Sequence, residues 1–158
     1  MATTVPQLTQ NITINFQQLA VDVNGTVTGG TNHSLSGKAQ SLRVSHRRRT
    51  AEITALDGGI VNNVPIRDEW TIEAEQIRRS GGGTSANPLQ NIAMGTNGSD
   101  YARLILVMGT AAATTLTTWT YDGVITEYEV NAQDPNVIDR MVLVSMDTGA
   151  ANPSYVHS

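Results

Sequence analysis

The fold is decided by residues 119–146, which read WTYDGVITEYEVNAQDPNVIDRMVLVSM. Two segments of this stretch, 124–130 and 137–146, alternate in the two-residue period of a half-buried strand. In the first segment one face carries Val124, Thr126, Tyr128 and Val130, and the other carries Ile125, Glu127 and Glu129. Tyr128 and Val130 mark the core face, so Glu127 and Glu129 are expected to point away from the core. The residues between the segments, 131–136, include a proline and several Asx side chains, which interrupt strands and favour turns. Two strands joined so closely are expected to be antiparallel neighbours in a sheet.

The composition fits one β-rich domain that is partly covered by other molecules. The chain has 158 residues, a length that predicts a single domain over 1–158. Charged residues make up 15% of it, against about 25% in an average globular protein. Because charge is depleted at the cores of interfaces, this scarcity favours a subunit of an assembly. There is no cysteine, which excludes disulfides and thiol chemistry.

Charge is distributed unevenly along the chain. Residues 1–50 carry five basic residues against one acidic residue, and the remainder carries five against thirteen. A basic front segment and an acidic remainder would attract each other between copies of the same chain.

The first part of the chain predicts short strands and then a projecting hairpin. Within an N-terminal segment, 1–36, residues 12–23 alternate as a weak strand, and Asn24-Gly25 is a strong hairpin signal. Gly29-Gly30 is expected to break the strand that follows, and 37–45 read as another strand. The excursion over 44–64 has a basic root and a glycine-bearing tip. We expect it to be an extended arm that packs on another molecule.

The basic root of this arm admits two interpretations. Arg47, Arg48 and Arg49 follow His46, and a basic run raises the hypothesis of nucleic-acid binding. No aromatic residue stands beside them to stack on a base, as a single-strand binder requires. A solvated strand edge or a subunit contact is therefore favoured.

The middle of the chain predicts a second strong strand and one short helix. In 64–77, Trp70 and Ile72 mark the core face, and Glu69, Glu73 and Glu75 alternate onto the other face. A helix is expected from the capping residues Ser85 or Asn87 through Pro88 to Gly95, with an apolar stripe of Leu89, Ile92 and Ala93. The apolar run 101–108 predicts a strand buried on both faces. Residues 148–158 are expected to be a tail that only a neighbour would order.

No pattern in the sequence predicts catalysis, a cofactor or a metal site. The three histidines, His33, His46 and His157, are far apart and lack ligand spacing. The glycine run 81–83 lacks the Gly-Lys-Ser/Thr ending of a phosphate-binding loop. Glu127 and Glu129 would suit a glycosidase only in a cleft with aromatic platforms, and the chain is poor in aromatics. We therefore expect no enzyme. Neither a signal peptide nor a membrane anchor is indicated.

The order of these segments resembles that of phage tail tube proteins, which are related to the tube protein of type VI secretion. The arm, the acidic strand, the short helix and three closing strands follow one another over residues 38–149. The most similar part runs from Tyr121-Asp122-Gly123 through 124–130 and 131–134 to 142–149, which ends in an Asp/Gly turn.

The resemblance implies an antiparallel β-sandwich or barrel with one short flanking helix, which assembles as a hexameric ring. Stacked rings would form a hollow tube for DNA, filled by a length-setting tape-measure protein before ejection. The protein would belong to the virion tail and be assembled in the host bacterial cytoplasm, beside other tail proteins. DNA would pass through without specific binding. The alternative is another virion protein, either a capsid decoration protein or a neck protein.

Two sets of residues are assigned by hypothesis within such a tube. Glu73, Glu75, Glu127 and Glu129 are expected to face the lumen, because an acidic wall keeps a passing duplex from adhering. Arg47, Arg48, Arg49 and Asp57, from the arm, are expected to contact the next ring.

Overall fold

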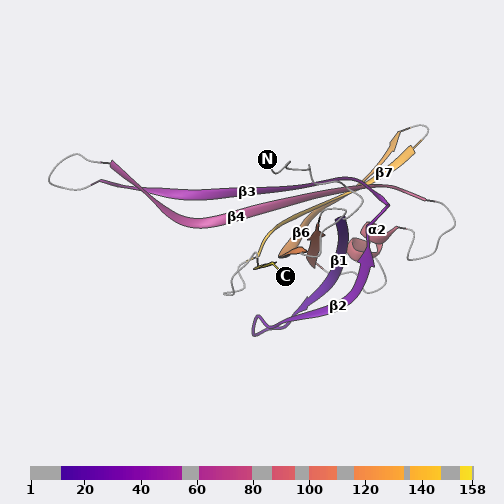
Figure 1. Ribbon diagram of the computed structural model, residues 1–158, viewed down its shortest axis with the longest axis horizontal. Helices are drawn as coiled ribbons and strands as arrows, with labels where there is room; N and C mark the ends of the chain where they lie inside the picture. Colours follow the sequence, from indigo (N-terminus) through magenta and orange to yellow (C-terminus); the bar gives the residue numbers. More distant parts are fainter. Residues whose placement is uncertain are drawn as a thin grey trace, which may run out of the picture.

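The computed structural model describes residues 12–54, 61–79, 87–94, 100–109, 116–133, 136–146 and 154–157, and all eight strands described there belong to one antiparallel sheet (Figure 1). The strands are β1 (Ile12–Val21), β2 (Val27–Ser34), β3 (Ala39–Thr54), β4 (Val61–Ile77), β5 (Tyr101–Met108), β6 (Thr117–Gln133), β7 (Asn136–Ser145) and β8 (Ser154–His157). Their order is β2-β1-β5-β6-β7-β4-β3, and β8 pairs with β6 beside this path. The one helix among the described residues is α2 (Pro88–Met94).

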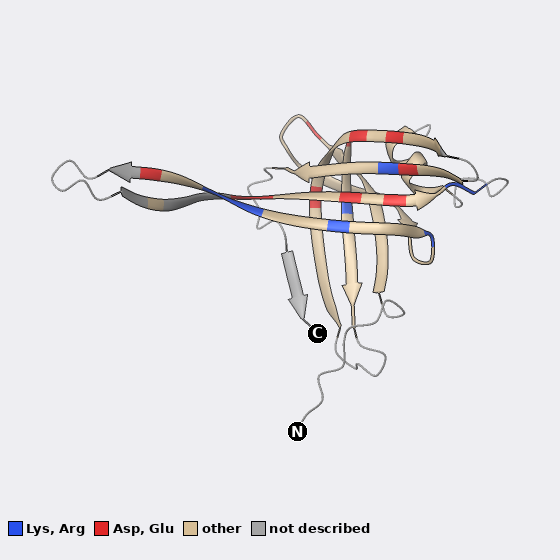
Figure 2. Cartoon of the chain, turned by 90° about the horizontal axis from the view of Figure 1, so that it is seen from above, with Lys and Arg blue, Asp and Glu red and all other residues tan. Residues whose placement is uncertain are grey.

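The sheet folds over on itself about β6. The first half of this long strand pairs with β5 and the second half pairs with β7. The strands β7, β4 and β3 consequently form a second layer that crosses the first at a steep angle (Figure 2). Phe16, Leu104 and Tyr121 of the first layer meet Trp70 and Met141 of the second in the core. The predicted mainly β, sandwich-like or barrel-like fold with one short helix is confirmed, although the sheet described for this chain is open and does not close into a barrel.

The helix closes one end of the core. Leu89 and Ile92 are fully buried, which confirms the predicted apolar stripe. Asn87 stands just before Pro88 at the start of the helix, as the sequence predicts. Ser85 and Gly95 lie outside the described residues.

Strands β3 and β4 extend far beyond the body as a two-stranded ribbon (Figure 1). Strand β4 pairs with β7 only over Thr71–Ile77, so its residues before Thr71 pair with β3 alone. We call residues 46–54 and 61–70 the arm; the sequence placed it at 44–64. Asp57 lies outside the described residues.

Three details of the strands differ from the expectations. Gly29 and Gly30 do not break a strand, because β2 runs through them and pairs with β1. Strand β5 is fully buried only on the face of Ala102, Leu104 and Leu106, and its other face is half-buried. Ser154–His157, expected to need a neighbouring subunit, pair with β6 of the same chain.

A β-bulge in β6 corrects the predicted faces of that strand. Ile125 pairs with Leu143 and Glu127 with Val142, so Thr126 is an extra residue. The bulge reverses the alternation. Ile125 and Tyr128 therefore both pack against the core. Val130, which the sequence places in the core, follows the bulge on the same face as Tyr128, but it is 44% exposed.

Candidate functional surface

The four glutamates singled out in the sequence lie on one face of β4, β7 and β6, opposite the core. In β4 the core face is marked by Trp70, Ile72 and Ala74, all of them buried. Glu73 and Glu75 alternate with these residues and therefore point away from the core. The strand register places Glu73 and Glu127 on either side of Val142, and Glu75 and Glu129 on either side of Arg140. We call these four side chains the acidic face.

Arg140 lies at the centre of the acidic face and joins its two sides. Its Nη1 atom is 2.7 Å from Oε1 of Glu127 and 3.9 Å from Oε2 of Glu129, and its Nη2 atom is 3.3 Å from Oε1 of Glu73. The arginine reduces the repulsion between carboxylates that face one another across β7. Sequence reasoning missed this role. The signal was available, since Arg140 is the only charged residue on its face of 137–146.

The acidic face continues onto β3, where its charge changes. Ser41 donates a hydrogen bond of 3.2 Å from Oγ to Glu75, and Arg43 stands opposite Glu73. Arg43 is exposed and forms no ion pair with the residues that the structure describes. Four carboxylates against the two guanidiniums of Arg43 and Arg140 leave the surface acidic. Figure 2 shows acidic positions in red and basic positions in blue on the adjacent strands of the second layer.

The arm arginines are used mainly within the arm itself. Arg48 Nε lies 2.8 Å from Asp68, and Arg49 Nε lies 2.9 Å from Glu69. The hydrogen bond from Arg48 to Asp68 raises the pKa of the guanidinium. Arg47 stands opposite Glu69 in the register. Two of the three predicted contact residues therefore already have a carboxylate partner across the ribbon.

Aromatic side chains pack at the root of the arm, where β4 leaves β7. The ring of Tyr121 meets Trp70 edge-on, with centroids 5.2 Å apart, and stacks parallel to Trp119. Its hydroxyl lies 3.1 Å from Nε2 of His46 in β3, and burial raises its pKa. Since His46 and Trp70 belong to the two strands of the arm, this cluster fixes the direction in which the arm leaves the body.

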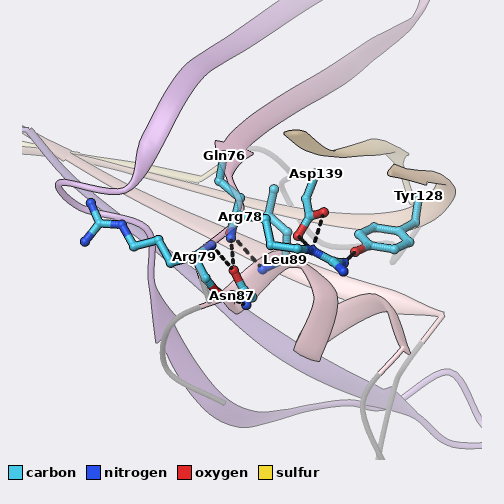
Figure 3. A network of polar contacts seen from close by, with 7 residues as sticks. All are labelled: Gln76, Arg78, Arg79, Asn87, Leu89, Tyr128 and Asp139. Carbon is cyan, nitrogen blue, oxygen red and sulfur yellow. Dashed lines mark hydrogen bonds and ion pairs between the residues drawn. The ribbon is translucent and has the colours of Figure 1, made fainter. Parts of the chain in front are cut away.

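A buried polar network holds the other end of β4 against β7 and the helix (Figure 3). Arg78 Nε donates to Asp139, which is fully buried, and its Nη2 donates to the hydroxyl of Tyr128 at 3.1 Å. Burial of Tyr128, together with the nearby carboxylate of Asp139, raises the pKa of its phenol. These groups satisfy one another, so the network is structural and no member is left available for chemistry.

Gln76 and Asn87 continue this network to α2. Gln76, which is also buried, accepts a hydrogen bond from the backbone N–H of Leu89 and donates to Asn87. Asn87 in turn accepts from the backbone N–H of Arg79 and donates to its carbonyl. The start of the helix is thereby fixed to the end of β4.

An apolar groove of about 490 Å³ opens between β1, β5 and the start of β3. Ile12, Leu42, Leu106 and Met108 line it, with Ser36, Gln40 and Ser41 as its polar side chains. No titratable side chain is among its lining residues, so it has no group for acid–base chemistry. Among the described residues there is no cluster of His, Cys, Asp or Glu that would hold a metal ion. In the same part of the chain, no helix has the length and apolarity needed to cross a membrane.

Comparison with solved structures identifies proteins of the same fold. The chain is similar to a protein in the virion of a native gene transfer agent particle, with a TM-score of 0.55 and 11% identity over 96% of this chain and 99% of the other. It is also similar to a protein in the sheath/tube terminator structure of the PVC extracellular contractile injection system, with a TM-score of 0.59 and 12% identity over 99% of each chain.

A third similar structure is the SPP1 tail tube, with a TM-score of 0.57 and 12% identity over 97% of this chain and 79% of the other. No family model matches the sequence, and no curated protein matches it either. The likeness predicted from the order of segments is thus confirmed in three dimensions: the chain has the fold found in structures of phage-like tails and contractile injection systems.

Proposed function

We propose that this protein is the structural subunit of a hollow phage tail tube, built from stacked hexameric rings through which DNA is delivered. The observation that carries the proposal is the acidic face. It is a net acidic surface, with four carboxylates against the guanidiniums of Arg43 and Arg140, on the face of the second layer that points away from the core, in a fold that similar structures place in tails. The proposal includes no enzymatic activity and no cofactor.

The open edges of the second layer support closure into a ring. The outer edge of β3 and the second half of β6, on the side away from β7, have no neighbouring strand among the described residues. These two edges lie at opposite ends of the layer. A head-to-tail contact between them, repeated around an axis, removes both edges from solvent and generates a closed inner barrel.

The acidic face would then line the lumen. Glu73, Glu75, Glu127 and Glu129 would repeat around the axis as a wall with the same sign as DNA. Binding of DNA comes from neutralised phosphates and released counterions, and such a wall offers neither. Arg140 keeps the wall compact within each subunit and does not reverse its charge.

The arm is proposed to contact the next ring, through the segment that includes Arg47, Arg48, Arg49 and Asp57. The projection of the ribbon from the body supports this role. Because Arg48 and Arg49 are paired across the ribbon, the contact would rest on the shape of the arm as well as on its charge. The further partners would be a length-setting tape-measure protein in the lumen and other tail proteins, in a virion tail assembled in the host cytoplasm.

Electron microscopy of the purified protein tests this proposal. Hollow rods with a reconstructed six-fold cross-section, and the four glutamates on the inner wall, are expected. The same glutamates on the outer surface would contradict the lumen assignment. Single rings that never stack would instead support a terminator role, which the likeness to a sheath/tube terminator structure favours as the second candidate. A protein that stays monomeric until it is offered a capsid would be a decoration or neck protein.

A further inference from the structure

The charges along the second layer alternate in a row that stops at an open edge. Ser41, Glu75, Arg140 and Glu129 stand side by side on β3, β4, β7 and β6. Arg140 has a carboxylate on either side of it, Glu75 on β4 and Glu129 on β6. Opposite charges directly across two strands stabilise a sheet, so this row is favourable within the subunit. It ends at Glu129, whose carboxylate side chain is 53% exposed.

The opposite edge of the layer carries the complementary charge. Arg43 is on β3, on the same face as the glutamates, because it stands directly opposite Glu73. It is exposed and has no carboxylate partner among the described residues. One edge of the layer thus ends in a carboxylate and the other begins with a guanidinium.

We propose that Arg43 of one copy pairs with Glu129 of the next, and that this pair sets the register in which neighbouring copies join. The inference rests on the proposed tube. In the layer, β3 and β7 run one way and β4 and β6 the other, so β6 of one copy meets β3 of the next antiparallel. The row of charges then continues without interruption, as Glu75, Arg140, Glu129, Arg43 of the next copy and Glu73 of the next copy.

We call the contact between β6 of one copy and β3 of the next the seam. The residues on the core side of the seam fit the same register. With Arg43 opposite Glu129, an antiparallel pairing sets Leu42 opposite Val130 and Val44 opposite Tyr128. Leu42, Val44 and Tyr128 already pack at the border of the core, and Val130 is one of the large apolar side chains left exposed. The contact would bury it. A slip of one residue would put charge against apolar groups on both sides. A slip of two would set Glu129 opposite an uncharged serine, Ser45 in one direction and Ser41 in the other. The second of these slips would still set Arg43 opposite Glu127, but Val130 would then face Gln40 in place of Leu42.

This register also brings the first residue of β3, Ala39, close to the last residue of β6, Gln133. The two edges are therefore used over their matching length. Across the seam, the row that ends at Glu129 in one copy joins the row that begins at Arg43 in the next. Within one copy these two rows are two residues apart along each strand. Closing a sheet into a barrel requires such a stagger.

Cysteine cross-linking tests the register, because the natural chain contains no cysteine. The variant with Arg43→Cys and Glu129→Cys, assembled and then oxidised, should give a ladder of covalent multimers on a denaturing gel. Residues directly opposite across a seam have Cβ atoms about 4.5–5.5 Å apart, close enough for a disulfide to form with a small adjustment of the strands. The matched control, Ser45→Cys with Glu129→Cys, is displaced diagonally to about 7–8 Å and should remain monomeric on the gel.

The outcomes separate the seam from the tube. A ladder from the control variant and none from the first would overturn the register. Intact tubes with no ladder from either variant would overturn the seam and leave the tube standing. A wild-type protein that forms neither rings nor tubes would overturn both.

A double-mutant cycle with neutral side chains provides a second test if cysteines impair assembly. Arg43→Gln should raise the protein concentration needed for assembly by about two- to fivefold, the effect of losing one cross-strand ion pair. Adding Glu129→Gln to this variant should raise it no further, with circular dichroism confirming that each variant is folded. Strictly additive effects of the two substitutions, when all variants are folded, would count against the pair.

Discussion

Trp70 packs directly over Gly123, so closely that a Cβ atom at the glycine would lie 2.6 Å from Cη2 of the indole and 2.7 Å from the carbonyl oxygen of Val144. The contact joins β4, at the root of the arm, to the middle of β6, across β7. Because Gly123 has no side chain, the indole can approach the backbone of β6 here, and this is the point at which the sheet turns from its first layer into its second.

Gly123→Ala is expected to destabilise the subunit by about 1–3 kcal/mol, because the added methyl group overpacks this contact. Chemical denaturation of the unassembled protein measures the change. Trp70→Phe removes the outer ring atoms, so the double variant should cost less than the sum of the single variants. The relief should be partial, since the carbonyl of Val144 is still in the way. Strict additivity would show that the indole does not oppose the methyl group.

Replacing Arg78 by alanine is expected to cost about 3–5 kcal/mol, because it leaves the buried carboxylate of Asp139 without its counterion. Asp139→Asn should cost less, since the amide still accepts a hydrogen bond and Arg78 remains partly hydrated. Urea unfolding measures both changes. Arg79→Ala is the matched control. Its guanidinium makes a long hydrogen bond of 3.5 Å to the carbonyl of Gly37, and the loss of stability should stay within about 0.5 kcal/mol. Equal losses from Arg78→Ala and Arg79→Ala would contradict the structural role of the network.

The turn between β1 and β2 should weaken in acid because of Asp22. Its carboxylate accepts hydrogen bonds from the backbone N–H groups of Thr26 and Asn24, which lower its pKa below the ordinary value of 3.8. A carboxyl group with a lowered pKa in the folded state stabilises that state at neutral pH, and the contribution is lost as pH falls through the folded pKa.

Amide hydrogen exchange at Thr26 is therefore expected to lose protection in acid, beyond the intrinsic change with pH. Asp22→Asn keeps an acceptor oxygen and removes the titration, so its protection should not show this loss. The same acid loss in the Asn variant would assign it to another group.

Neutralising the acidic face should make the proposed tube adhere to DNA. Replacing Glu73, Glu75, Glu127 and Glu129 by glutamine leaves Arg43 and Arg140 as the charges of this surface. DNA supplied as a short duplex should then bind, with a logarithmic salt slope of about 0.9 for each phosphate neutralised. Glu52→Gln with Asp100→Asn changes charge elsewhere and serves as the control. Unchanged DNA binding in the quadruple variant would argue that these residues do not line the channel.

The arm should depend on its arginines for stacking and not for folding. Alanine at Arg47, Arg48 and Arg49 removes the exposed ion pairs to Asp68 and Glu69, and such solvent-screened pairs contribute little to stability, so the chain should still fold. Under the proposed inter-ring contact the variant should yield rings that stack poorly, as seen by negative-stain microscopy. Normal tubes with weaker DNA binding would favour the nucleic-acid interpretation of the basic run.

The sequence predicts the strands and the helix well because their patterns are local. Trp70 and Ile72 correctly identify the core face of β4 over residues 70–76, since two-residue alternation of burial holds there. In β6 the same reasoning places Val124 and Thr126 on the face of Tyr128 and Ile125 on the opposite face, and fails, because no local signal announces an extra residue at Thr126. The sequence correctly predicts that Glu127 and Glu129 point away from the core. Their direction is read from Tyr128, and all three residues follow the bulge, so the alternation between them is regular.

The candidate surface was predictable only in part, because it depends on which strands are neighbours. Each strand shows its own glutamates, but the placement of Arg140 between them follows from the order β6-β7-β4. The partnership of Arg78 with Asp139 and Tyr128 spans even more of the chain. Long-range pairings of this kind have no periodic trace in a single sequence.

In the proposed tube, the arm would have a kinetic consequence for assembly from free subunits. A two-stranded ribbon without a hydrophobic layer beneath it is only marginally stable in water. Beyond the aromatic cluster at its root, the described part of the ribbon is held chiefly by its own ladder and by exposed ion pairs. Local opening of such a segment costs far less than unfolding of the domain. If docking orders the arm, each addition to the end of a growing rod includes a small folding step. A finished end that holds arms in place would then recruit subunits faster than free subunits find one another, so growth would be favoured over spontaneous initiation.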